Sequence, residues 1–378
     1  PRSTLFPYTT LFRSISDLFP AAGIKFWDCA HECNAGMSAD GFTRATGKMS
    51  MAIAQNGPGI TNFVTPIITA YWNHSPLLLV TPQAANKTIE QGGFQEVKQM
   101  AVFENMVCYQ EEVREPSRIA EVLNRVIEKA RRESAPAQIN VPRDYWTHEI
   151  DIELPQIIRM ERSPGGKNAI AEAAKLLSDA QFPVVLNGAG VVLSGAIESS
   201  RALAEKLDSP VCCNYQHNDA FYGSHPLFVG PLGYNGSKAA MELISRADVV
   251  LALGTRLNPF STLPCYGIDY WPANARIIQV DINADRIGLT KKVDVAIQGD
   301  ARRVADQIYE QLSDNAGDTD RDARRELIAQ SKSGWQEELA SMVHEDDDPG
   351  TNWNQHSRDR EPNCMSPREA WQIGRAHV

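Results

Sequence analysis

The sequence predicts an α/β chain with two doubly wound domains, each built on a parallel sheet with helices on both faces. Short apolar runs alternate with segments of helix length, which is typical of such sheets. A polar stretch with Pro and Gly, ERSPGGKN at 161–168, interrupts the alternation, and a second alternating series begins at residue 182. The 378 residues are 43% hydrophobic and 22% charged, enough to form two ordinary cores.

In the first half, helices are predicted between short buried strands. One helix is expected over Glu32–Thr46, ended by Gly47, and another over Pro116–Glu133. The runs without polar alternation indicate strands buried on both faces. These predicted strands are 24–27 (IKFW), 49–54 (MSMAIA), 76–81 (PLLLVT) and 137–141 (AQINV).

The second half repeats the pattern and then becomes charged. We expect the first domain to span 15–155 and the second 165–312, and we find no shared motif between them. Residues 313–372 contain DNAGDTDRDARRE and HEDDDPG, which predict a linker with one or two solvated helices. The strands predicted for the second domain lie in 182–190, 247–255, 275–283 and 295–300.

The two ends of the chain are expected to be non-native. Back-translation of TLFPYTTLFRS, residues 4–14, resembles a sequencing-library adapter, and IGRAHV, residues 373–378, resembles its partner. We therefore exclude 1–14 and 373–378 from fold reasoning. We then expect the natural segment 15–372 to be an incomplete piece of a gene.

The composition and net charge of the chain argue against some classes of partner. A net charge of -10 argues against nucleic acid, and no apolar run reaches the length of a membrane span. Seven scattered cysteines, an odd number, argue against a disulfide framework and favour the reducing cytoplasm. Cys29 and Cys33 flank His31, but a zinc site needs a second pair of ligands, so we expect no metal there.

Glu32 is the first candidate for chemistry. A metalloprotease would need a second His four residues after His31, and position 35 is Ala. An acid at a helix start can also merely complement the helix dipole. However, the turn QNGPGITN (55–62) and the segment QGGFQE (91–96) also follow predicted strands. Since ligands of parallel sheets bind where strands end and helices begin, these segments can meet at one edge.

These motifs resemble a known family. HE…A…DGFTRATG, NGPGITN and GFQE are similar to the pyrimidine-binding domain of thiamine-diphosphate enzymes of the acetolactate synthase group. Longer strings, such as AYWNHSPLLLVTPQAANKTIEQGGFQEV and GTRLNPFSTLP, resemble the members that act on sulfoacetaldehyde. The resemblance covers nearly all of 15–372. It implies an N-terminally truncated pyrimidine-binding domain followed by a Rossmann-like central domain.

The resemblance also implies site residues. Glu32 would share a proton with the N1′ nitrogen of thiamine diphosphate and so activate the cofactor. Gln95, the second candidate catalytic residue, lies with Phe94 in a loop that approaches the reacting centre from the partner subunit in the family. The cofactor-binding candidates are Glu32, Gly57, Pro58, Asn62 and Phe94.

The implied reaction converts sulfoacetaldehyde and phosphate to acetyl phosphate and sulfite, a step of taurine and sulfonate degradation. Both substrates are anions, and Lys87 is a hypothetical contact for them, although a solvated loop lysine is an equal alternative. The cofactor of the family lies between subunits, which implies a homodimer or homotetramer.

The family binds Mg²⁺ on a Gly-Asp-Gly segment of a C-terminal diphosphate-binding domain. Here GDAR at 299–302 is the nearest match, and it has no second Gly. We therefore expect that domain to be absent and this piece to be inactive alone, with no metal site of its own. The acidic run HEDDDPG (344–350) is a further cation candidate, although such runs are usually solvated loops.

Two other functions stay open. One is an acetolactate synthase-like reaction on pyruvate, and the other is a non-catalytic nucleotide-binding module built on the second domain. In NGAGVVLSG (187–195) the glycines fall at 188, 190 and 195, so the sequence lacks the GxGxxG fingerprint. We therefore favour an empty, structural second domain. His217 and His225 are interpreted as polar loop residues rather than ligands.

Overall fold

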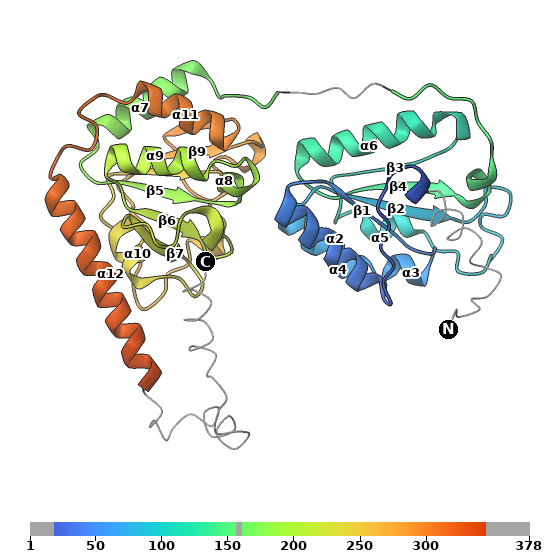
Figure 1. Ribbon diagram of the computed structural model, residues 1–378, viewed down its shortest axis with the longest axis horizontal. Helices are drawn as coiled ribbons and strands as arrows, with labels where there is room; N and C mark the ends of the chain where they lie inside the picture. Colours follow the sequence, from blue (N-terminus) through green and yellow to red (C-terminus); the bar gives the residue numbers. More distant parts are fainter. Residues whose placement is uncertain (1–18, 156–160, 345–378) are drawn as a thin grey trace. The chain divides into compact units, whose positions relative to one another are not determined.

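The computed structural model describes residues 19–155 and 161–344 (Figure 1). The chain divides into two compact units, residues 1–159 and 160–378. Each unit holds a parallel sheet with helices on both faces, which confirms the predicted fold class.

The sheet of the first unit has the strand order β1-β2-β4-β3. Leu79 in β2 pairs with Ala52 in β1 and with Gln138 in β4. Every residue of β2 and β4 is buried, because both strands are central in the sheet and covered on two faces. The strands are β1 (Ser50–Ile53), β2 (Leu77–Gln83), β3 (Tyr109–Glu112) and β4 (Ala137–Pro142).

Two apolar layers cover the faces of this sheet. Leu77 and Leu79 pack with α2, α4 and α5, whereas Leu78 and Val80 pack with α6 on the opposite face (Figure 1). This alternation is the two-residue period of a strand. The helices are α2 (Glu32–Thr46), α3 (Pro58–Thr61), α4 (Val64–Trp72), α5 (Gln99–Phe103) and α6 (Ile119–Glu133), with 3-10 turns η2 (Pro116–Arg118) and η3 (Arg143–Thr147).

One strand prediction in this unit is wrong, and one strand was not predicted. Residues 24–27 form no strand: they pair with none of the described strands, and Trp27 is 81% exposed. An apolar run becomes a strand only beside a neighbour that shares its hydrogen bonds. Conversely, β3 was not predicted, because it is an edge strand whose Glu111 pairs with Arg125 of α6 instead of entering the core.

The sheet of the second unit has the strand order β10-β9-β8-β5-β6-β7. The predicted strands at 182–190, 247–255, 275–283 and 295–300 are confirmed as β5, β8, β9 and β10. The sequence reading missed β6 and β7, which are short. The strands are β5 (Pro183–Asn187), β6 (Val211–Asn214), β7 (Phe228–Leu232), β8 (Val249–Leu253), β9 (Arg276–Asp281) and β10 (Val295–Gln298).

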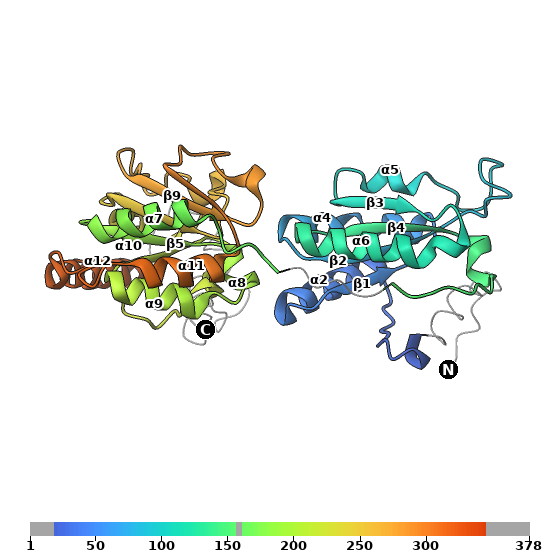
Figure 2. The same cartoon turned by 90° about the horizontal axis from the view of Figure 1, so that it is seen from above.

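Helices cover both faces of the second sheet. In Figure 2, α7, α9 and α11 lie together over one face, and α10 packs on β6 and β7 from the other. The helices are α7 (Lys167–Asp179), α8 (Ala189–Leu193), α9 (Ile197–Leu207), α10 (Lys238–Ile244), α11 (Ala301–Gln311) and α12 (Arg321–His344), with 3-10 turns η4 (Asn218–Ala220), η5 (Pro259–Ser261) and η6 (Ala284–Arg286).

Helix α12 differs from the solvated linker that the sequence suggests. Its Arg324 is 3% exposed and donates hydrogen bonds to the carbonyls of Leu207, Asp208, Gln181 and Thr319. Leu207 and Asp208 end α9, where the helix dipole favours a cation. Burial lowers the pKa of Arg324, because the guanidinium group loses its contact with water. The four carbonyls must therefore replace the hydrogen bonds that water would have made.

The later turns of α12 also pack against the rest of the second unit. The Trp335 ring lies 5.4 Å from the Tyr266 ring, and Lys238 Nζ lies 2.9 Å from Glu338 Oε2. The sequence hid this packing because the few apolar residues of α12 are widely spaced. None of the helices in 19–155 and 161–344 is long and apolar enough to cross a membrane.

The first testable prediction concerns this arginine. Arg324→Met should lower the free energy of unfolding by about 3 kcal/mol, because it leaves several buried carbonyls without donors. Equilibrium unfolding in urea measures the effect. Arg302→Met, on the exposed face of α11, is the matched control and should change stability by less than about 0.5 kcal/mol. Equal effects of the two substitutions would show that Arg324 does not anchor α12.

Candidate active site at the edge of the first sheet

The candidate site lies where β1 and β2 of the first unit end. Helix α2 begins there, and His31 caps it: Nδ1 of His31 accepts a hydrogen bond of 3.1 Å from the backbone N–H of Cys33. The imidazole therefore has a structural task at the helix start. This capping places Glu32 in the first turn of α2, at the sheet edge.

The Glu32 carboxylate faces the Gly-Pro-Gly turn. Asn62 Nδ2 donates to Glu32 Oε2 over 2.9 Å. A Cβ atom placed on Gly59 would lie 3.2 Å from Glu32 Oε1, so the carboxylate also lies close to the backbone of the turn. Glu32 is half-buried, and among the described residues no donor is bonded to its Oε1. This oxygen is free to accept a hydrogen bond from a ligand.

The turn itself depends on Gly57. Its φ is +73°, in the left-handed region that favours glycine. A Cβ atom at Gly57 would lie 2.5 Å from the carbonyl oxygen of Gln95, a distance that real Cβ atoms essentially never show. The backbone of the turn and the loop that contains Gln95 therefore lie in direct contact.

Two amide side chains hold this contact. Gln55 Nε2 donates to Gln95 Oε1 over 2.6 Å, and Asn56 Nδ2 donates to the Gln95 carbonyl over 3.1 Å. Gln95 itself has a φ of +60°, which is uncommon for a residue with a side chain. The two hydrogen bonds help to offset the cost of that conformation. We call Gln55, Asn56, Gly57 and Gln95 the clasp.

The loop before the clasp carries its own support. The carboxylate of Glu96 accepts the backbone N–H groups of Glu90 and Gly93. Behind it, the buried side chain of Gln99 donates to the carbonyl of Pro82 and to Asn140 Oδ1. The loop is thus tied both to itself and to the ends of β2 and β4. These ties position Gln95 at the sheet edge.

The structure brings some of the predicted residues together and leaves others outside. Glu32 and Asn62 bond to each other, and Gly57 touches Gln95. Pro58 is exposed at the start of α3, and Phe94 is 75% exposed at the loop surface. Lys87 is exposed in the loop after β2. The roles expected for these residues, in catalysis and in cofactor or anion binding, stay predictions.

Two features were not foreseen from the sequence. Gln55 and Asn56 were overlooked, although two amides between a strand end and a Gly-Pro-Gly turn are a usable signal for a polar cluster. In addition, Gln95 lies against Gly57 of its own chain, so no second subunit is needed to bring Gln95 to this turn.

In residues 19–155 and 161–344, no group of three or more His, Cys, Asp or Glu side chains is placed to hold a metal ion. Most of the acidic run at 344–350 lies outside the described residues. The described cysteines are free thiols, and burial raises the pKa of Cys108 to about 12.

The crevice of the second unit lies between β5 and β8, where the strand order reverses. There a Cβ atom on Gly190 would lie 2.6 Å from Gly254 Cα, and one on Gly188 would lie 2.6 Å from the Gly254 carbonyl oxygen. Gly190 also donates its N–H to the Gly254 carbonyl over 2.9 Å. The glycines thus let two loops of the chain pack on each other.

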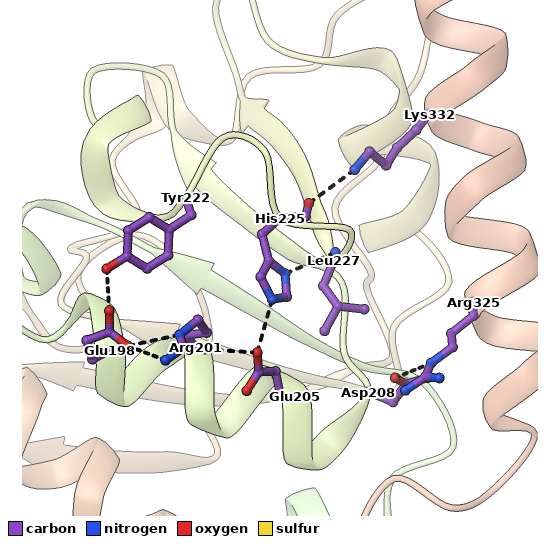
Figure 3. Close-up of polar contacts among 9 residues, drawn as sticks. All are labelled: Glu198, Arg201, Glu205, Asp208, Tyr222, His225, Leu227, Arg325 and Lys332. Atoms are coloured by element: carbon purple, nitrogen blue, oxygen red, sulfur yellow. Dashed lines mark hydrogen bonds and ion pairs between the residues drawn. The ribbon is translucent and has the colours of Figure 1, made fainter. Parts of the chain in front are cut away.

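A second polar cluster joins α9, the loop before β7 and α12 (Figure 3). His225 Nδ1 accepts from the Leu227 N–H, and His225 Nε2 lies 3.2 Å from Glu205 Oε1. Lys332, whose pKa is lowered by burial, donates to the carbonyls of His225 and Pro226. These contacts tie the loop to α9 and dock α12 on its backbone, so the cluster has a structural explanation.

Comparison with known proteins identifies two domains. The model "Thiamine pyrophosphate enzyme, N-terminal TPP binding domain" matches residues 7–102, and "Thiamine pyrophosphate enzyme, central domain" matches residues 170–308. A thiamin diphosphate-dependent enzyme from Mycobacterium smegmatis has the same fold, with a TM-score of 0.65 at 20% identity. The likeness covers 75% of this chain and 55% of that one.

Curated relatives are more similar in sequence. A probable sulfoacetaldehyde acetyltransferase of Rhizobium meliloti is 73% identical over 94% of this chain and 60% of its own length. A sulfoacetaldehyde acetyltransferase of Roseovarius nubinhibens is 71% identical over 94% and 59%. A probable acetolactate synthase large subunit of Methanocaldococcus jannaschii is 36% identical over 72% and 47%. The chain thus spans about 60% of the length of the first two relatives.

The second testable prediction compares two glycines. Gly57 and Gly92 both have φ near +70°, but only at Gly57 would an added Cβ meet another residue within 4 Å. Gly92→Ala should therefore cost about 1 kcal/mol from backbone strain alone. Gly57→Ala should cost about 2 kcal/mol more and separate the turn from Gln95. Urea unfolding and amide exchange at residues 55–62 measure both effects, and equal costs would contradict the contact.

Proposed function

Because the chain belongs to the thiamine pyrophosphate enzymes, whose N-terminal and central domains it carries, we propose that the whole protein is a thiamine-diphosphate-dependent acetyltransferase. Its reaction converts sulfoacetaldehyde and phosphate to acetyl phosphate and sulfite. The names of the relatives at 73% and 71% identity support this choice of substrate. The placement of Glu32 against the Gly-Pro-Gly turn is the structural observation that carries it.

The residues of the site fit the aminopyrimidine of the cofactor. In the part of the chain that the structure describes, no donor is bonded to Glu32 Oε1, and the neighbouring Gly59 leaves room beside it. Asn62 fixes the other carboxylate oxygen, so the side chain is aimed before any ligand arrives. A carboxylate in this position can hold and return a proton at a weakly basic ring nitrogen.

Bound thiamine diphosphate supplies a nucleophilic carbon and an electron sink. Glu32 holds the proton at N1′, and the roles proposed for Gly57, Pro58 and Phe94 are to line the pyrimidine ring. The clasp holds Gln95 beside the Gly-Pro-Gly turn, which supports its proposed role at the reacting centre. The first unit therefore supplies orientation and proton transfer. Lys87, in the exposed loop after β2, stays the proposed cationic contact for the substrates.

The assembly and location are part of the same proposal. Mg²⁺ would be needed together with the diphosphate, because this hard cation prefers phosphate and carboxylate oxygens as ligands. The whole protein acts as a homodimer or homotetramer in the cytoplasm, where the free thiols found in the described residues persist. Residues 15–155 form the pyrimidine-binding domain and 165–312 the central domain.

The competing functions have weaker support. The relative named acetolactate synthase is 36% identical, about half the identity of the two sulfoacetaldehyde acetyltransferases. A nucleotide-binding module would use the crevice between β5 and β8, but there the loops at Gly188 and Gly254 pack against each other. A measurement of sulfite release from sulfoacetaldehyde and phosphate distinguishes the proposed acetyltransferase from these two alternatives.

The third prediction tests the role of Glu32. In the whole protein, supplied with thiamine diphosphate and Mg²⁺, Glu32→Gln should reduce sulfite release from sulfoacetaldehyde and phosphate by about 10²–10⁴-fold, because an amide cannot shuttle the proton. Glu104→Gln, at an exposed glutamate next to α5, is the control and should retain activity. Full activity of Glu32→Gln would contradict the proposal, as would acetolactate formation from pyruvate without sulfite release by the unmodified protein.

A further inference from the structure

The hydrogen bond between Gln55 and Gln95 fixes more than the position of the loop. Gln55 Nε2 donates to Gln95 Oε1 over 2.6 Å, so the amide oxygen of Gln95 is directed at Gln55. The NH₂ group of Gln95 then points away from Gln55. Among residues 19–155, no acceptor is bonded to this NH₂ group. Gln95 is partly exposed, so its two N–H donors are available to a ligand.

The charge of the surroundings decides which ligand suits these donors. The side chains that bond to one another here are Glu32 with Asn62, and Gln55 and Asn56 with Gln95. The set contains one carboxylate and no cation. An anionic substrate that approaches Glu32 is repelled by it, and hydrogen-bond donors beside the turn would offset that repulsion.

We propose that Gln55 is a positioning residue that holds the Gln95 amide with its NH₂ group toward the substrate, where this group binds an oxyanion. The oxyanion is the sulfonate of the aldehyde or the attacking phosphate, which share the same oxygen chemistry. This inference rests on the proposed function and adds Gln55 to it. The two N–H donors of a planar amide can reach two oxygens of a tetrahedral oxyanion group.

The opposite amide orientation makes a different prediction. If Gln95 donated to Gln55, its carbonyl oxygen would face the substrate and repel an oxyanion. Gln55→Glu enforces this orientation, because an ionised carboxylate can only accept hydrogen bonds. Gln55→Met keeps the length of the side chain and removes the hydrogen bond without enforcing either orientation. If the orientation of the Gln95 amide matters for substrate binding, Gln55→Glu should therefore weaken binding more than Gln55→Met does.

The experiment uses the whole protein loaded with thiamine diphosphate and Mg²⁺. Sulfite release gives kcat and the KM values for sulfoacetaldehyde and for phosphate separately. Gln55→Met should raise the KM of one anion about tenfold with a smaller change in kcat, the scale of one lost hydrogen bond. Gln55→Glu should raise the same KM further. The anion whose KM rises identifies the oxyanion that Gln95 binds.

A double variant separates positioning from general damage. If Gln55 acts through Gln95, then Gln55→Met combined with Gln95→Met should behave like Gln95→Met alone. Gln330→Met, which removes the amide that donates to Glu326 on α12, is the matched control and should keep both KM values. Thermal unfolding and cofactor affinity are measured for every variant. Gln55→Glu serves as the main variant if Gln55→Met does not fold.

Several results would overturn this inference without contradicting the proposed function. These are unchanged KM values in Gln55→Met, a Gln55→Glu enzyme as good as the unmodified one, or losses that multiply in the double variant. KM changes that only follow a lower unfolding temperature would also overturn it. An unmodified protein that releases no sulfite would instead overturn the proposed function, and the inference with it.

Discussion

The close approach of the Gly57 backbone to the Gln95 carbonyl is the constraint on which the candidate site depends. Gly57 has a φ of +73°, and a Cβ atom at this position would lie 2.5 Å from the carbonyl oxygen of Gln95. Both features require glycine here. The contact joins the segment after β1 to the segment after β2. Because neighbouring parallel strands end at the same edge, two segments distant in sequence become one polar surface.

The contact between Gly57 and Gln95 explains which residues of the loop have a strained backbone conformation. Glu90 and Gln95 both have positive φ, and each is held by hydrogen bonds, from Glu90 to the Glu96 carboxylate and from Gln55 and Asn56 to Gln95. A conformation of this kind costs about 1–3 kcal/mol and persists only where the surroundings determine it. The loop is therefore preorganised before a ligand binds.

The partner of Glu32 differs in charge from the partners of a paired surface carboxylate. On the outer side of the first unit, Glu121 lies between Arg118 and Arg125, whose hydrogen bonds lower the pKa of Glu121 to about 2. Such a carboxylate stays ionised and is unsuited to proton transfer. Glu32 instead has the neutral amide of Asn62, which fixes its orientation without a compensating charge.

The sequence was most informative where local rules decide structure, and least where distant residues do. Helix α2 was predicted over its observed range because Gly47, with φ of +67°, ends it and the pattern before it is helical. Buried strands such as β2 were found because both faces are apolar. Edge strand β3 and the docking of α12 depend on Arg125 and Arg324, whose partners are distant in sequence.

The candidate site shows the same limit. Motif resemblance singled out Glu32, Asn62 and Gln95, but it could not show that Gln55 bonds to Gln95 across 40 residues. That pairing follows from the register of β1 beside β2, which no short motif encodes. Residue types at a strand end thus indicate that a polar site exists. The identity of each partner requires the sheet order and the turn geometry.

The second unit shows why a shared fold does not fix a function. Its strand order creates the crevice that dinucleotides use in related sheets, between β5 and β8. In a dinucleotide site, glycines leave room for a phosphate beside the helix start. Here Gly188 and Gly190 make room for the backbone at Gly254, and Asn214 donates to Thr255 behind them. Glycine therefore serves the packing of loops at Gly57, Gly188 and Gly190, whereas at Gly59 it lies beside a carboxylate. What distinguishes the two uses is the atom that the missing Cβ would meet: Gly254 of the opposing loop in the second unit, and the Glu32 carboxylate beside Gly59 in the first.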